Sequence, residues 1–187
     1  MKVRPAGVVR DVLLIEPSVH RDARGHFFER FQEARFAELG LPTTFRQENQ
    51  SRSRRGVIRG LHFQRRRPQG KLVQCVQGSV FDVAVDLRSD SPTFGRWVGV
   101  ALDAEHPRLL WVPPGLAHGF CVTSEEADLQ YKCTELWDPD DDLGLSWADP
   151  ELAIAWPTDA PILSERDRAL PVLAMLRATL AGAANID

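Results

Sequence analysis

Short apolar runs, separated by turn residues, dominate the middle of the chain. The runs are rich in β-branched and aromatic residues, which predicts strands rather than helices. Residues 79–87 alternate cleanly, with Phe81 and Val83 on one face of the strand and Asp82 and Ala84 on the other. Strands are expected at residues 8–15, 43–49, 57–63, 71–77, 79–87, 97–102, 108–112, 119–122 and 129–135.

Two segments follow a helical pattern instead. Residues 32–39 predict a short helix, with Gly40 in the usual C-terminal position. Residues 163–181 are helical by composition with a break at Pro171, and residues 182–187 predict a loose tail. So many strands with so few helices favour an all-β sandwich or barrel that ends in a helical segment.

The length of 187 residues predicts one domain with a sizeable core. A net charge of -3 gives no general attraction to nucleic acid or to an anionic membrane. No apolar run approaches the ~20 residues of a membrane span, and the N-terminus lacks the apolar segment of a secretory signal. Cys75, Cys121 and Cys133 lie in apolar runs and predict reduced core thiols of a cytoplasmic protein, not a disulfide framework.

Two histidines follow a barrel-like pattern. The motif Pro113-x-Gly115-x-x-His118 resembles the second motif of cupins, which are small double-stranded β-helix barrels. The first cupin motif supplies a His-x-His pair and a later Glu as metal ligands, whereas this chain has His62-Phe63-Gln64. Because a metal site needs about three protein ligands, we expect no metal. The alternative is that the two histidines are unrelated residues of a β protein.

Basic residues gather between Glu48 and Asp82, where no acidic residue occurs. Such segregation in a chain of negative net charge indicates an anionic ligand, because arginine forks suit phosphate oxygens. Arg59 is expected to be half-buried, since it lies within an apolar strand pattern. A solvated loop is the alternative for residues 65–67, and RNA binding lacks an aromatic platform here. The cluster comprises Arg52, Arg54, Arg55, Arg59, Arg65, Arg66, Arg67 and Lys71.

Two further residues each allow a structural and a functional interpretation. Tyr131, the only tyrosine, is in phase with Leu129 and Cys133 and so faces the apolar side of its strand. It is either a core residue or a group that faces a ligand. Asp167 follows Ser164 at the start of a helical pattern, which is typical of a helix cap, but a carboxylate can also orient a histidine.

Taken together, the motifs are similar to those of the dTDP-4-dehydrorhamnose 3,5-epimerase family. The resemblance is collinear and covers roughly residues 5–175. It rests on Asp22-x-Arg24-Gly25-x-Phe27-x-Glu29, Gln47-x-Asn49-x-Ser51, Gly56-Val57-Ile58-Arg59-Gly60-Leu61-His62-Phe63-Gln64, Gly70-Lys71, the segment from Asp82 to Arg88, Ser91-Pro92-Thr93-Phe94-Gly95, the Pro113 motif, Tyr131-Lys132-Cys133, Trp147-x-Asp149-Pro150, Ile154-x-Trp156-Pro157 and Leu163-Ser164-x-x-Asp167.

The resemblance implies a metal-free, cupin-type jelly roll that binds a dTDP-sugar and needs no cofactor. It implies that His62 is the catalytic base, Asp167 its carboxylate partner, Tyr131 the acid on the opposite face of the sugar, and Lys71 the group that stabilises the enolate. It also implies a homodimer with exchanged N-terminal strands. The implied substrate contacts are Arg24, Phe27, Glu29, Gln47, Asn49, Arg59, Lys71, His118, Trp137, Asp142 and Arg166.

Three positions depart from the family pattern. The family usually has tyrosine in place of Trp137, often glutamate in place of Asp142, and lysine in place of Arg166. The expected activity is inversion of C3 and C5 of a dTDP-4-keto-6-deoxyhexose. The alternatives are a mono-epimerase that acts at C3 or C5 only, a non-catalytic cupin that binds a sugar nucleotide, and a metal-dependent cupin oxygenase.

Overall fold

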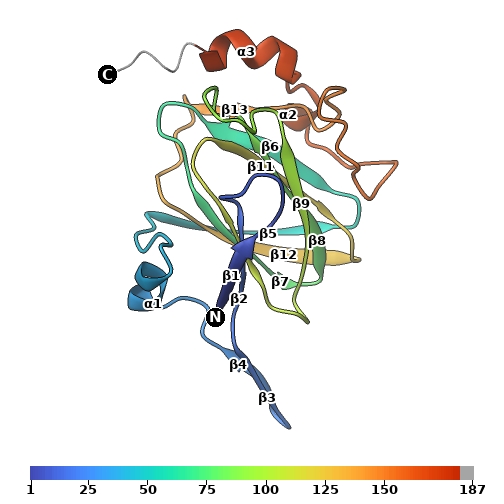
Figure 1. Ribbon diagram of the computed structural model, residues 1–187. Coiled ribbons are helices and arrows are strands. Elements are labelled where there is room, and N and C mark those ends of the chain that lie inside the picture. The colour runs from blue at the N-terminus through green and yellow to red at the C-terminus, as the bar shows by residue number, and fades with distance from the viewer. Residues whose placement is uncertain (182–187) are drawn as a thin grey trace.

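Antiparallel strands form two facing sheets in the computed structural model, which describes residues 1–181 (Figure 1). The expected all-β fold is confirmed. The six-stranded sheet has the order β1-β2-β10-β7-β12-β5 and the five-stranded sheet the order β13-β6-β11-β8-β9. The strands of the first sheet are β1 (Lys2–Pro5), β2 (Leu13–Glu16), β5 (Gln47–Arg54), β7 (Lys71–Gln77), β10 (Leu109–Val112) and β12 (Glu126–Cys133). Those of the second are β6 (Ile58–Gln64), β8 (Ser79–Asp86), β9 (Trp97–Asp103), β11 (Leu116–Val122) and β13 (Asp142–Gly144).

The main core lies between the two sheets. Val73 and Leu129 of the six-stranded sheet pack with Ala84 and Phe120 of the five-stranded sheet. Val9 and Val12 are fully buried in the same cluster. These two residues belong to the turn between β1 and β2, so the strand expected at 8–15 is confined to its last part. The core fills one end of the barrel and leaves the other end to polar side chains.

Helices cover the outer faces of the sheets. The helix α1 (Glu33–Glu38) buries Phe36 against Leu72 and Trp111 on the six-stranded sheet. The helix α3 (Leu173–Ala181) packs Leu173 and Leu176 against the outer face of the five-stranded sheet. The short helix α2 (Glu165–Arg168) precedes it, and Pro171 lies in the break between them. The helical segment expected at 163–181 is therefore confirmed with its interruption, while the expected tail at 182–187 lies outside the described residues.

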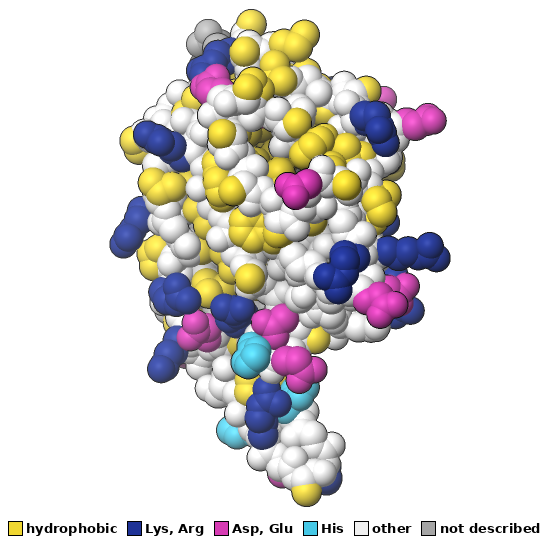
Figure 2. All heavy atoms as spheres, turned by 90° about the vertical axis from the view of Figure 1, so that its right-hand side faces the viewer, with side chains coloured by type: hydrophobic (Ala, Val, Ile, Leu, Met, Phe, Trp, Pro, Cys, Tyr) yellow, Lys and Arg dark blue, Asp and Glu magenta, His cyan; other side chains and the backbone are white. Residues whose placement is uncertain are grey.

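A hairpin of β3 (Val19–Asp22) and β4 (Gly25–Phe28) projects from the body of the molecule (Figures 1 and 2). The expected turn between Asp22 and Gly25 closes it. Its attachment includes a hydrogen bond of 2.6 Å from the Arg21 guanidinium to the Glu105 carbonyl oxygen. Phe27 on this hairpin is 71% exposed. Because the Phe27 ring remains in water, it contributes little hydrophobic stabilisation to the fold of a single chain.

Candidate active site

A cavity of about 750 Å³ opens between the two sheets at the polar end of the barrel. Strands β5, β6, β7, β11 and β12 supply its walls, and the segment from Ile162 to Asp167 closes one side. Most of the residues that the sequence predicted as a site meet here. They are Gln47, Asn49, Arg59, His62, Lys71, His118, Tyr131, Trp137, Asp142, Arg166 and Asp167.

His62 and Asp167 form a hydrogen-bonded pair in this cavity. The Nε2 atom of His62 lies 2.7 Å from Oδ1 of Asp167, although 105 residues separate them in the sequence. Burial alone would raise the pKa of Asp167, but the hydrogen bond and charge of His62 hold it below its ordinary value. An ionised Asp167 accepts the Nε2 proton, which leaves Nδ1 of His62 free to accept a proton from a ligand.

Both interpretations of Asp167 hold at once. Ser164 is the N-cap of α2, and its side-chain oxygen accepts a hydrogen bond of 3.0 Å from the backbone N–H of Asp167. The cap is made with the backbone N–H of Asp167. Its carboxylate, 6% exposed, is free to turn toward β6 and His62. The start of α2 therefore sets the position of the Asp167 carboxylate. This carboxylate in turn sets the orientation of the His62 ring.

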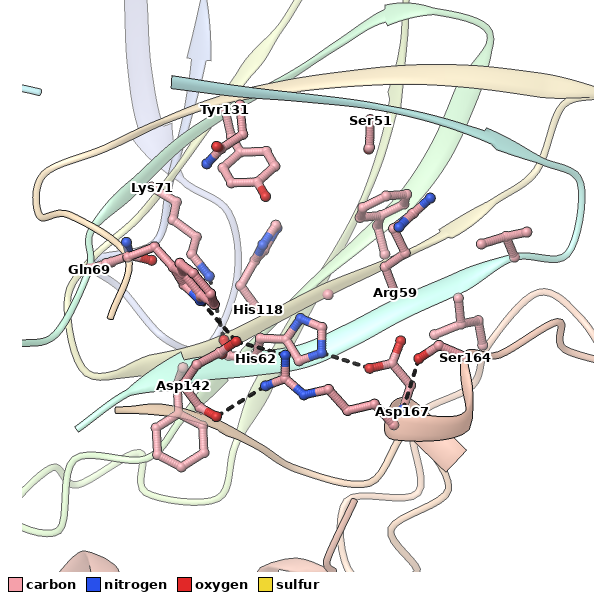
Figure 3. A pocket seen from close by; sticks show the side chains of 18 of the residues that line it. Ser51, Arg59, His62, Gln69, Lys71, His118, Tyr131, Asp142, Ser164 and Asp167 are labelled. Carbon is pink, nitrogen blue, oxygen red and sulfur yellow. Dashed lines mark hydrogen bonds and ion pairs between the residues drawn. The ribbon is translucent and has the colours of Figure 1, made fainter. Parts of the chain in front are cut away.

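Tyr131 lies across the cavity from His62, and its hydroxyl points into the space between them (Figure 3). It comes from β12, in register with Asn49 on β5 and Val73 on β7. Burial raises the pKa of Tyr131 above its ordinary value, so the phenol stays protonated at neutral pH. The cavity therefore holds a proton acceptor on one side and a proton donor on the other.

Lys71 is the cation of the cavity interior. It is 8% exposed, and its Nζ lies 3.5 Å from the backbone oxygen of His62. Burial lowers the pKa of Lys71, and the negative groups around it, including Asp142 and Asp82, oppose that shift. A buried ammonium with weak protein contacts can stabilise an oxyanion that develops on a ligand.

Trp137 stands at the mouth of the cavity, 53% exposed. Its indole Nε1 donates to Oδ2 of Asp142 at 3.0 Å, and the Arg166 guanidinium donates to the same oxygen at 2.7 Å. The loop that carries Trp137 is held by Gln64, whose amide nitrogen donates to the Leu136 carbonyl oxygen at 3.2 Å. The glutamine in place of a second cupin histidine thus has a structural role. The three departures from the family pattern form one connected cluster.

The basic residues divide into two groups. Arg59 and Lys71 line the cavity. Arg59 is exposed rather than half-buried as predicted, because its part of β6 opens to the cavity mouth, and its Nε donates to Ser53 Oγ at 2.9 Å. Arg67 pairs with Asp138 at 3.0 Å, which supports the solvated-loop interpretation of residues 65–67. Arg52 pairs with Asp128 on the outer face of the sheet.

Three predicted substrate contacts lie away from the cavity. Arg24 and Phe27 are on the projecting hairpin, where they border a separate small cavity. Glu29 follows the hairpin and pairs with Arg35 at 2.6 Å. None of the three lines the main cavity of this chain.

Gln69 and Ser164 of the cavity wall, and Asp82 next to it, were not predicted from the sequence. Asp82 is fully buried behind the wall, and its Oδ1 lies 2.8 Å from Nε2 of His118. Its place in a strand of alternating pattern gave no signal, because an aspartate there is typical of a solvated face.

Within residues 1–181, no group of three or more His, Cys, Asp and Glu side chains is arranged to hold a metal ion. Cys75, Cys121 and Cys133 are buried free thiols, as expected. No helix in that range has the length and apolar character needed to cross a membrane.

The sequence model of the dTDP-4-dehydrorhamnose 3,5-epimerases matches residues 7–175. The dTDP-4-dehydrorhamnose 3,5-epimerase of Pseudomonas aeruginosa is 56% identical to the chain over 162 residues, which cover 86% of this chain and 90% of that protein. The chain belongs to the dTDP-4-dehydrorhamnose 3,5-epimerase family. The predicted family is therefore confirmed, and with it an isomerase.

Two other relatives of this family bear on the site. The crystal structure of a dTDP-6-deoxy-D-glucose-3,5-epimerase from Legionella pneumophila, in complex with dTDP-4-keto-L-rhamnose, has a TM-score of 0.91 and 46% identity over 96% of both chains. This similarity confirms the cupin-type arrangement of two antiparallel sheets. The dTDP-4-dehydrorhamnose 3-epimerase of Streptomyces niveus is 46% identical over 179 residues, which cover 95% of this chain and 86% of that protein. Members that invert one or two centres thus resemble this chain.

Proposed function

We propose that the cavity inverts C3 and C5 of dTDP-4-dehydro-6-deoxyglucose and so forms dTDP-4-dehydro-L-rhamnose. The observation that carries the proposal is the His62–Asp167 pair, 2.7 Å apart, on one side of a cavity whose opposite side presents the hydroxyl of Tyr131. Inversion of a carbon requires removal of a proton from one face and return of a proton to the other, and this pair of opposed groups suits both steps.

The chemistry starts from the C4 ketone, which acidifies the protons at C3 and C5. His62 takes a proton through Nδ1, and Asp167 stabilises the imidazolium that forms. The electron pair of the broken C–H bond moves into an enolate, whose oxygen gains negative charge. Tyr131 then donates its proton to the carbon from the opposite face, and the C4 carbonyl forms again. Solvent removes the proton from His62 and returns one to the Tyr131 phenolate before the next inversion. No oxidant or reductant enters this balance, because the product is an isomer of the substrate.

Lys71 is the group that we assign to the enolate oxygen. Its ammonium is held by the barrel before the substrate arrives, so little reorganisation is needed when charge develops. His118, on the neighbouring wall, contacts the sugar as a polar partner. Loss of either group would raise the barrier of the enolisation rather than prevent binding of the nucleotide.

The nucleotide end is assigned to the polar wall of β5 and to Arg59. Gln47 and Asn49 present amide groups on this wall, and Arg59 offers a guanidinium to the pyrophosphate. Arg24, Phe27 and Glu29 complete this end from the hairpin of a second copy, in a homodimer with exchanged N-terminal segments. Binding energy at the nucleotide holds the ring between His62 and Tyr131. The whole chain acts as one epimerase domain in the cytoplasm.

A mono-epimerase is the second candidate. It is favoured by the similarity to the 3-epimerase of Streptomyces niveus and by Trp137, which is bulkier than the tyrosine common in the family. Tryptophan keeps an apolar face but cannot act as a phenolic acid. A larger wall restricts the movement of the ring that a second inversion needs.

Incubation of the native protein with dTDP-4-dehydro-6-deoxyglucose in D2O distinguishes the candidates. Double epimerisation predicts deuterium at both C3 and C5 by NMR, together with the signals of the L-rhamno product. Deuterium at only one carbon would favour the mono-epimerase. A chain that binds the substrate but introduces deuterium at neither carbon would be a binding protein, and the proposal would be wrong.

A further inference from the structure

Asp82 is a fully buried carboxylate in the middle of β8. Its side chain lies on the face of the strand that points between the two sheets, where its neighbours on that face, Val80 and Ala84, are part of the apolar core. A carboxylate in such surroundings costs free energy unless its oxygens are well paired. An apolar residue at this position would continue the pattern of the core, so packing alone does not explain the aspartate.

The two oxygens of Asp82 have different surroundings. Oδ1 lies 2.8 Å from Nε2 of His118. Oδ2 has no hydrogen-bond donor among residues 1–181. Within the described residues, the one hydrogen bond of the Asp82 side chain therefore joins it to a residue that lines the cavity.

Strand order explains how the contact arises. The strand β11 lies between β8 and β6, so that His118 is opposite Ala84 on one side and opposite His62 on the other. Asp82 is opposite Phe120, one step along the same face, and reaches the His118 ring diagonally. Three adjacent strands thus carry Asp82 behind the wall, His118 in the wall and His62 in the cavity.

The hydrogen bond decides which nitrogen of His118 meets a ligand. A carboxylate can only accept, so Nε2 of His118 must carry a proton. Its second nitrogen, Nδ1, makes no hydrogen bond with a protein group within the described part of the chain. His118 is 6% exposed and stands beside the catalytic tyrosine, with ring centroids 6.5 Å apart (Figure 3).

We infer that Asp82 is a positioning residue that fixes the orientation and the tautomer of His118, so that Nδ1 contacts the oxygen-bearing sugar of the substrate. This inference rests on the proposed function and extends it to a residue outside the cavity wall. Asp82 acts through His118 and does not touch the substrate. Burial of an unpaired oxygen lowers the stability of the core. This cost indicates that Asp82 has a role in the site rather than in packing.

The chain offers a matched control on the same strand. Asp86 lies on the same face of β8 and is also fully buried, but its carboxylate accepts from Arg88 Nε at 2.9 Å and from Thr93 Oγ1 at 2.7 Å, away from the cavity. Asp82→Asn and Asp86→Asn are therefore the same chemical change in two buried sites. One site serves His118 and the other serves a loop.

The experiment compares kcat, KM and Tm of the two variants. A carboxamide can donate to Nε2 as well as accept from it, so Asp82→Asn no longer fixes the tautomer. We expect kcat to fall about 10–100-fold, as for other residues that orient a functional imidazole, with little change in KM or Tm. Asp86→Asn should lower Tm and leave kcat within about twofold. The opposite pattern, a loss of Tm with normal kcat in Asp82→Asn, would make Asp82 a structural residue and overturn the inference.

A double-mutant cycle tests whether Asp82 acts on kcat through His118. In a His118→Gln background, Asp82→Asn should change kcat by less than about twofold, because the residue through which it acts is gone. An undiminished effect in that background, or one that disappears only with Lys71→Met, would mean that Asp82 does not act through His118.

A measurement without turnover separates this inference from the proposed function. In the native protein, NMR should detect a slowly exchanging Nε2 proton of His118 that His118→Gln removes and Asp82→Asn shifts or broadens. Its absence from the native protein would overturn the inference whether or not the chain is an epimerase. If the native protein fails to epimerise but shows this proton, the proposed function alone is wrong.

Discussion

At the scale of single residues, the site depends on one carboxylate in two structural roles. Asp167 gives its backbone N–H to the cap of α2 and its side chain to His62. The hydroxyl of Ser164 also helps to hold the pKa of the Asp167 carboxylate below its ordinary value, after the larger contribution of His62. The position of His62, the proposed base, therefore depends on the start of a helix that is far away in the sequence.

Asp167→Asn should separate orientation from binding. The carboxamide keeps the size of the side chain but cannot stabilise an imidazolium, so kcat should fall by about 10²–10⁴-fold. The dissociation constant for dTDP, measured by calorimetry, should stay unchanged. Ser164→Ala is the matched control: it removes the cap, costs about 1 kcal/mol of stability and should reduce kcat far less. Equal losses of kcat in both variants would mean that Asp167 matters only for the helix.

Trp137 should influence the balance between the two inversions. Its indole is bound to Asp142 and so forms a fixed wall at the mouth of the cavity. We expect the ratio of deuterium uptake at C3 and C5 to change in Trp137→Tyr, while the sugar nucleotide still binds. NMR of both proteins in D2O measures the ratio. An unchanged ratio would show that this wall does not control the second inversion.

The proposed base and acid of the cavity, His62 and Tyr131, could be predicted from the sequence because each lies in a motif that resembles the family. Asp82 could not, because its environment depends on which face of β8 is covered. The sequence places the apolar Val83 and Val85 on one face of the strand and the polar Asp82 on the other. In the structure both faces are buried, the second one against the opposite sheet.

At the scale of elements, the bounds of β5 and β12, two neighbouring strands of the cavity wall, were predicted poorly. The expected strand at 43–49 is β5 at Gln47–Arg54, and the expected strand at 129–135 is β12 at Glu126–Cys133. Residues 47–54 carry no apolar pattern, because one face of β5 is the polar cavity wall and the other is solvated. Strands with an apolar inner face, such as β7 at Lys71–Gln77, were predicted with correct bounds.

The end of β8 should contribute stability that depends on pH. Burial opposes ionisation of Asp86, but hydrogen bonds from Arg88, Ser91 and Thr93 lower its pKa from 3.8 to about 2. The folded protein therefore binds this proton less readily than the unfolded chain. The lowering corresponds to about 2 kcal/mol of stability, which is fully present above pH 3.8 and is lost as the pH falls toward 2.

Chemical denaturation of the native protein and Asp86→Asn at several pH values measures this contribution. The variant should be less stable at neutral pH, and the difference should shrink between about pH 4 and pH 2. A difference that is independent of pH would mean that the hydrogen-bond geometry, not the charge of Asp86, stabilises this end of the strand.

At the scale of the whole molecule, the projecting hairpin separates two halves of the predicted site. Arg24 and Phe27 lie on it, whereas the proposed base and acid lie in the barrel. An exposed aromatic ring on an extended hairpin suits contact with another copy of the chain. The sequence alone could not reveal this separation, because the motif that contains Arg24 gives no distance to the barrel.

Removal of the hairpin should weaken assembly and activity together. A variant that lacks residues 1–23 tests the proposed exchange, although it also deletes β1 and β2. Phe27→Ala and Arg24→Ala, which keep the sheet, are therefore the sharper variants. We expect them to raise KM and to reduce the dimer fraction in light scattering, with Tm of the body retained. A fully active monomer at low concentration would contradict the exchanged dimer.

We propose that His62 removes the proton at both carbons. The most direct measurement is the rate of deuterium uptake from D2O at C3 and C5 of dTDP-4-dehydro-6-deoxyglucose, with native protein and with His62→Ala. We expect deuterium uptake at both carbons to fall by about 10²–10⁴-fold in His62→Ala, while the affinity for dTDP is retained. Near-normal uptake at either carbon in His62→Ala would show that another residue is the base there.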